Sequence, residues 1–79
     1  MTHTFVKTES GAIYEFTDRF TSFRRTSTDA PLRKDGEWLK CEIVEPVVGE
    51  DMHLCIHGIV AAPGFTYRRT TPVVAIWEG

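Results

Sequence analysis

The sequence has only two cysteines, no long apolar run and no excess of basic residues. Cys41 and Cys55 are too few for the disulfide framework of a small secreted domain, so we expect both thiols to be reduced. No stretch approaches the ~20 apolar residues of a membrane span, and the opening residues MTHTFVKTE lack the basic and apolar segments of a signal peptide. We therefore expect the chain to stay in the cytoplasm.

The net charge limits the classes of partner. The formal charge is −2 and the sequence pI is near 5.8. The chain as a whole is therefore not attracted to the phosphates of nucleic acids or to anionic lipids. Binding to either would need a local basic patch.

The length of 79 residues supports a single domain with one hydrophobic core. The composition, 42% hydrophobic and 25% charged, is typical of a globular protein and not of a disordered chain. Because so small a core leaves little stability to spare, we expect the chain to gain stability by forming a symmetric dimer.

Short β-forming runs alternate with turn residues about every ten residues, a spacing that predicts six or seven strands. Residues 3–8 and 12–17 are predicted to form a hairpin across Glu9, Ser10 and Gly11, where glycine permits the left-handed conformation of the turn. In a third run, 19–26, the spacing of Phe20 and Phe23 breaks strict alternation and indicates a bulge or a bend.

The second half of the chain begins with a predicted long loop over residues 26–36, closed by a turn at Asp35 and Gly36. Residues 37–44 form a strand in which alternation places Trp38 on the outer face. After a turn at 48–50, residues 52–61 carry apolar residues on both faces, which is typical of a central strand.

The last two runs, 65–71 and 73–77, follow a turn at 62–64 and are predicted to form a final hairpin or edge pair. Pro72 is expected at the start of a strand, because proline cannot donate a hydrogen bond to a neighbouring strand. Val73, Ala75 and Trp77 are expected on one face and Val74 and Ile76 on the other, and this segment is the expected contributor to a dimer.

These strands predict an all-β domain, either a small SH3-like barrel or a β-sandwich of mainly antiparallel strands. We expect one group of alternating residues to be buried together: Leu39, Cys41, Ile43, Leu54 and Ile56.

Two short motifs carry a resemblance to known proteins. Residues 8–15, TESGAIYE, and residues 70–74, TTPVV, resemble the Ser-Gly-Ser-x-Tyr-Glu hairpin and the Thr-Ser-Pro-Val-Val ending of small proteins of actinobacteria and their phages. Ala12 and Thr71 stand where those proteins have serine. The resemblance implies an actinobacterial or phage origin and an all-β fold, and it implies no activity.

The sequence His53-x-Cys55-x-His57 has the residue types of a zinc site. On a strand, however, the two histidines would lie ~13 Å apart and could not reach one ion. We therefore predict no metal and no cofactor, and we interpret Cys55 as a core thiol with a histidine on either side. Cys41 on a neighbouring run remains the residue that could complete a zinc site.

No arrangement of residues indicates catalysis. Ser10, Ser22 and Ser27 lie in no known nucleophile context, Glu50 and Asp51 lie in a turn where their pKa values should be ordinary, and the glycines match no phosphate-binding loop. We therefore predict that the chain is not an enzyme.

Two arginine pairs, Arg24-Arg25 and Arg68-Arg69, lie on different runs near aromatic residues. Small barrels bind single-stranded nucleic acids with basic grooves and stacking aromatics, although each pair can place only one arginine on a given face. The structural alternative is that these arginines prevent edge aggregation and pair with acidic side chains: Asp18, Asp29 or Glu15.

The sequence therefore predicts a protein-interaction module that binds a protein partner or itself, with weak single-stranded nucleic-acid binding as the alternative. Exposed tryptophans commonly dominate interfaces, although Trp77 and Trp38 could instead plug and cap the mouth of a barrel. The candidate partner-binding residues are Tyr14, Arg24, Trp38, Tyr67, Arg68 and Trp77.

Overall fold

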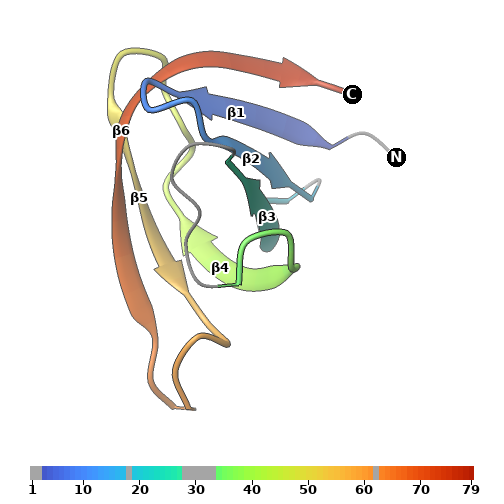
Figure 1. Ribbon diagram of the computed structural model, residues 1–79, viewed down its shortest axis with the longest axis vertical. Helices are drawn as coiled ribbons and strands as arrows, with labels where there is room; N and C mark the ends of the chain where they lie inside the picture. Colours follow the sequence, from blue (N-terminus) through green and yellow to red (C-terminus); the bar gives the residue numbers. More distant parts are fainter. Residues whose placement is uncertain (1–2, 18, 28–33, 62) are drawn as a thin grey trace.

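The computed structural model describes residues 3–17, 19–27, 34–61 and 63–79, and within these ranges the chain forms strands and no helix. Six antiparallel strands follow one another around a closed barrel (Figure 1). They are β1 (Thr4–Thr8), β2 (Ile13–Phe16), β3 (Ser22–Thr26), β4 (Leu39–Ile43), β5 (Asp51–Ile56) and β6 (Thr66–Glu78). The all-β prediction is confirmed, and the closed barrel is consistent with an SH3-like barrel. In the described ranges there is no helix able to cross a membrane.

The first hairpin forms as predicted. β1 pairs with β2 from Thr4 opposite Phe16 to Lys7 opposite Ile13. Gly11 in the connecting turn has a φ of +92°, a conformation that glycine adopts without steric cost. This turn fixes which residues of β1 and β2 face the interior.

The third run is shorter than predicted. β3 begins at Ser22, and Phe20 lies in the preceding turn with a φ of +55°. The ring of Phe20 still packs on Phe16, with 5.1 Å between the ring centroids. The irregular spacing of Phe20 and Phe23 therefore reflects a turn before the strand. In the predicted long loop, residues 28–33 lie outside the described ranges, and the turn that closes it is present over Lys34–Gly36.

The interior of the barrel is filled by one core: Val6, Ala12, Tyr14, Phe16, Phe23, Cys41, Met52, Leu54, Ile56 and Val73. Leu39 and Ile43 are partly buried and pack against it. The predicted group therefore packs together, with Cys41, Leu54 and Ile56 at its centre.

The two cysteines lie on opposite faces of the sheet. In the β4–β5 pairing Cys41 lies opposite Ile56, while Cys55 lies opposite the exposed Glu42. Cys41 is therefore the core thiol, and the prediction that Cys55 is one was wrong. β5 ends at Ile56 because Gly58 turns the chain with a φ of +98°, so the strand is shorter than the predicted run of 52–61.

The last two predicted runs are one strand of 13 residues, β6, and do not form a hairpin. Its first half pairs with β5 and its second half with β1 (Figure 1). Pro72 lies inside the strand, where both pairings shift register, and such irregularities accommodate a residue without an N–H.

The same irregularity changes the predicted faces of β6. Val73 is buried, whereas Ala75 and Trp77 lie opposite Lys7 and Phe5 of β1 on the outside. Trp77 therefore does not plug the barrel mouth.

Candidate functional site

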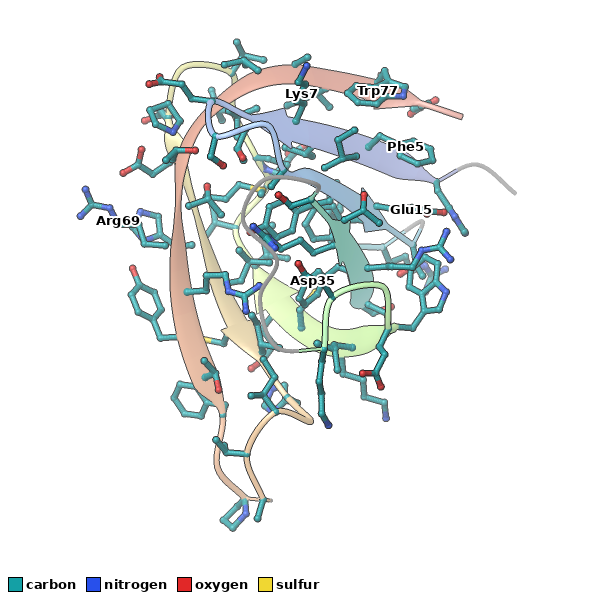
Figure 2. The ribbon with its side chains drawn as sticks, viewed as in Figure 1. Phe5, Lys7, Glu15, Asp35, Arg69 and Trp77 are labelled. Atoms are coloured by element: carbon teal, nitrogen blue, oxygen red, sulfur yellow. The ribbon has the colours of Figure 1, made fainter. Side chains whose placement is uncertain are left out.

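One row of outward side chains crosses four strands of the barrel. Trp77 on β6 lies opposite Phe5 on β1, Phe5 lies opposite Glu15 on β2, and Glu15 lies opposite Arg24 on β3. We call these four residues the outer row. Figure 2 shows Trp77, Phe5 and Glu15 one below another along the same side of the molecule.

The Trp77 end of the outer row is apolar. The indole of Trp77 stacks on the ring of Phe5, with 5.6 Å between centroids and 9° between the ring planes. Phe5 is half-buried, while Trp77 remains 41% exposed. One face of the indole is thus held by Phe5, and much of its remaining surface is open.

The centre of the row is a paired carboxylate. Arg24 Nη2 donates a hydrogen bond of 2.6 Å to Glu15 Oε1, and Nδ1 of His3 lies 2.6 Å from Glu15 Oε2. The hydrogen bond with His3 holds the pKa of Glu15 below its ordinary value of 4.5, Arg24 acts in the same direction, and partial burial opposes both. The negative charge of Glu15 is therefore paired with the positive charge of the neighbouring Arg24.

The other end of the row adjoins Trp38. The guanidinium carbon of Arg24 lies 5.0 Å from the centroid of the Trp38 ring, and His3 meets that ring edge-on at 5.6 Å. The first contact has the geometry of a cation–π interaction. Trp38 is 44% exposed, so a second tryptophan presents its surface at this end.

A separate group lies on the outer face of β5 and β6. Tyr67 is exposed, lies opposite Cys55, and its hydroxyl is hydrogen-bonded to Nδ1 of His53. His57 pairs with Glu42 at 3.4 Å. The two histidines thus have different partners, and no group of three or more metal-binding side chains converges within the described residues.

Three of the six candidate residues meet at the outer row or beside it, namely Arg24, Trp38 and Trp77. Tyr14 is only 3% exposed and packs against both Phe16 and Phe23, so its ring belongs to the core. Tyr67 lies with the separate group.

Arg68 lies opposite the buried Leu54, on the inner side of β6, so it and Tyr67 face opposite ways. Each arginine pair is split between faces as predicted, since Arg24 is outside and Arg25 is buried. Of the acidic partners considered from the sequence, Glu15 pairs with Arg24, while Asp18 and Asp29 lie outside the described ranges.

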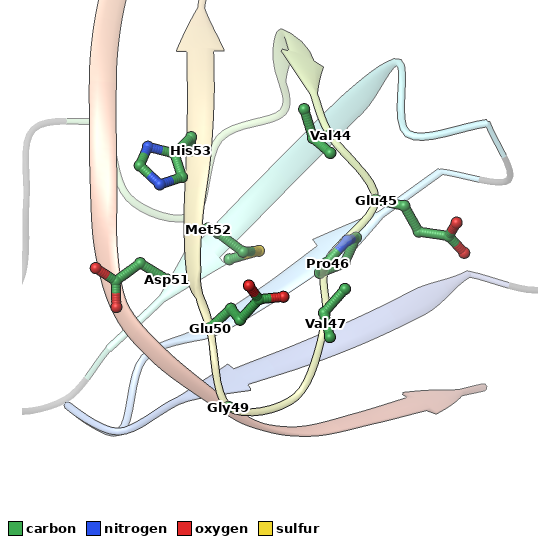
Figure 3. Close-up of a pocket in the computed structure, with 9 residues that line it drawn as sticks. All are labelled: Val44, Glu45, Pro46, Val47, Gly49, Glu50, Asp51, Met52 and His53. Carbon is green, nitrogen blue, oxygen red and sulfur yellow. The ribbon is translucent and has the colours of Figure 1, made fainter.

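A hollow of about 480 Å³ lies between residues 44–50 and the start of β5 (Figure 3). Its wall contains Glu45, Glu50 and Asp51, but Figure 3 shows Glu45 and Asp51 pointing away from each other on opposite sides. Asp51 is also bonded by Arg69 Nε at 2.8 Å. Glu45 and Asp51 therefore do not face each other across the hollow, and the outer row is the better defined candidate site.

Comparisons of the chain with protein-family models, curated proteins and solved structures gave no match. The assignment of a site therefore depends on the geometry of this chain.

Sequence reasoning missed Phe5 and His3, and it considered Glu15 only as an acidic partner for an arginine. The predicted hairpin turn at Gly11 sets the register of β1 with β2 and thereby places Phe5 opposite Glu15. That part of the row could have been found by extending this register along the two strands. The contact of Phe5 with Trp77 gives no such local signal, because it joins residues 72 positions apart in strands whose pairing depends on closure of the barrel.

Proposed function

We propose that this chain is a non-enzymatic protein-interaction module and that the outer row, together with Trp38, is its contact surface. The observation that carries the proposal is the pair of exposed tryptophans, Trp77 and Trp38, held at opposite ends of one fixed row. The resemblance noted in the sequence suggests that this chain is encoded by an actinobacterium or by its phage. Its partner would then be a protein of the actinobacterium.

Both tryptophans already make ring contacts within the chain. Trp77 is stacked on Phe5, and Trp38 is held between Arg24 and His3. A partner would therefore gain the burial of two large aromatic surfaces without the entropic cost of ordering them. Tryptophans and arginines in such settings are the commonest sources of binding energy in protein interfaces.

The charge of the surface also favours a protein partner. Single-stranded nucleic acids are bound by several accessible cations that line a path beside stacking aromatics. Here Arg24 is paired with Glu15, Arg69 with Asp51, and Arg25 is buried beside Asp35. The outer row therefore offers a phosphate one arginine, Arg24, and this arginine already has a carboxylate partner.

The test is capture of partners by the tagged chain from a lysate of the actinobacterium that encodes it or that is the host of its phage. Trp38→Ala and Arg24→Ala should each lose the captured protein. The matched controls are Phe65→Ala, an exposed aromatic away from the row, and Arg69→Ala, an exposed arginine that also pairs with a carboxylate. Equal capture by all four variants would remove the outer row from consideration.

Treatment of the lysate with nuclease, and a salt series, separates the nucleic-acid alternative. A protein interface should survive nuclease and depend weakly on salt, whereas binding through phosphates weakens steeply as counterions are released. Loss of capture on nuclease treatment would favour the alternative.

A further inference from the structure

Among the described residues, the second half of β6 has a neighbouring strand on one side only. Residues 73–78 pair with β1, whereas the pairing with β5 ends where Pro72 lies opposite Asp51. Figure 1 shows this half of β6 as the outermost strand, beyond β1. Val73 still exchanges hydrogen bonds with Gly49 and Glu50, and past that point no described segment pairs with the outer edge.

The hydrogen-bond pattern identifies which backbone groups are free at this edge. His3 and Gly79 exchange both hydrogen bonds, at 3.0 and 3.1 Å. In an antiparallel pair such exchange recurs at every second residue, so Phe5 and Trp77 also form a hydrogen-bonded pair. The N–H and C=O groups of Ile76 and Glu78 therefore point away from β1, toward the open side.

Between Pro72 and Glu78 the open edge lacks the features that keep strand edges apart. Residues 73–77, VVAIW, are β-forming and uncharged, and Val74, Ile76 and Trp77 are all exposed. Natural barrels and sheets protect such edges with charges, prolines or covering segments. An unprotected apolar edge is the feature that a partner strand would cover.

We infer that a second copy of this chain adds its own β6 to this edge, antiparallel and related by a twofold axis that passes beside Trp77. This inference names the partner for one end of the outer row and rests on the proposed role of that row as a contact surface. In this register Ile76 of each copy exchanges hydrogen bonds with Glu78 of the other, so every free group of these two residues is used.

The side chains suit a second copy in the same register. Trp77 of one copy lies directly opposite Trp77 of the other on the outer face, and aromatic pairs across strands are stabilising. Each indole is already stacked on its own Phe5, so four aromatic rings form one line across the dimer. Glu78 lies opposite Ile76 and not opposite the other Glu78, so like charges do not face each other.

Sedimentation velocity of the full chain from low to high micromolar concentration is the first measurement, and it should show a monomer–dimer equilibrium. Amide hydrogen exchange followed by NMR then locates the interface. The amides of Ile76 and Glu78 should gain protection as the dimer forms, whereas those of Trp77 and Gly79, bonded to β1, should be protected at every concentration. A dimer in which Ile76 and Glu78 still exchange rapidly would overturn the inference.

Variants test the same geometry. Ile76→Pro removes an N–H that β1 does not use and should give a folded monomer. Should that variant fail to fold, Trp77→Ala serves instead: it should raise the dimer dissociation constant at least about tenfold, as loss of an interface tryptophan commonly does. Tyr67→Ala, an exposed aromatic on the same strand, is the control and should leave the constant unchanged.

A strictly monomeric wild-type chain at high micromolar concentration would also overturn the inference. The proposed function would survive that result if Trp38→Ala still abolished capture of a partner protein. The reverse result, a dimer with the expected amide protection but no partner that depends on Trp38, would leave the inference standing and the wider proposal without support.

Discussion

The guanidinium group of Arg25 is buried on the inner side of β3 and paired with the carboxylate of Asp35. It also lies over the ring of Tyr14, 5.9 Å from the centroid. The backbone reinforces the same connection, because the N–H of Gly36 donates a 2.8 Å hydrogen bond to the carbonyl of Arg25. The turn at Lys34–Gly36 is thereby attached to β3.

Removal of the carboxylate should therefore be costly. In Asp35→Ala a cation would be left in the interior without this partner, and we expect the free energy of unfolding to fall by about 3 kcal/mol. Asp51→Ala is the matched control, since it removes the partner of the exposed Arg69 and should cost at most about 1 kcal/mol. Chemical denaturation measures both, and equal small losses would show that Arg25 is not buried in solution.

The hydrogen bonds to Glu15 should make part of the stability depend on pH. The folded pKa of Glu15 lies below 4.5, so its ionised form favours the fold. This contribution is complete above the unfolded pKa and is lost as the pH falls through the folded pKa. An NMR titration of the Glu15 carboxyl should give a midpoint below 4.5 that rises in His3→Ala, and an unchanged midpoint in that variant would contradict the assigned cause.

The barrel core should be sensitive to loss of volume at its centre. Leu54 on β5 is fully buried in the core of the barrel. Leu54→Ala should lower the free energy of unfolding by about 2 to 5 kcal/mol, because the cavity cannot close completely. Val44→Ala, at a residue that is 81% exposed, should change it by less than about 0.5 kcal/mol. Thermal and denaturant unfolding provide the comparison.

The two thiols should differ in reactivity. Burial, with a smaller effect from Glu42, raises the pKa of Cys41 to about 11. Because the thiolate is the reactive form, an alkylating reagent at about pH 8 should modify Cys55 first and leave Cys41 largely intact in the folded chain. Mass spectrometry after digestion identifies the modified residue. In denaturant both should react, and rapid labelling of Cys41 in the native chain would contradict its place in the core.

The features that were predicted correctly from the sequence are mostly local. Gly11, with its positive φ, sets the first hairpin, and alternation around Cys41 identifies the core face of β4. Such patterns act over a few residues, so the sequence alone contains them. The all-β class and the first five strands followed from the same signals, whereas β6 was predicted as two separate runs.

The features that were missed depend on contacts between distant residues. Pro72 indicated a break between two strands, but irregular pairing on both sides lets β6 continue through it. Tyr14 and Arg25 have the residue types of a binding surface, yet the register of β2 with β3 turns both toward the interior. The outer row was only partly visible for the same reason, since its Trp77 end exists only when the barrel closes.

The two ends of the outer row should be separable by mutation. Arg24 lies three strands away from the open edge of β6, so Arg24→Ala should dimerise like the wild-type chain while losing capture of a partner protein. Trp77→Ala should shift the chain toward monomer. In a Trp38→Phe background Trp77 is the remaining tryptophan, and its emission should move to shorter wavelength as the dimer forms and its open surface is buried. If Arg24→Ala dissociated the dimer while Trp77→Ala did not, the interface would lie over the basic strands, and a polar partner would become the stronger hypothesis.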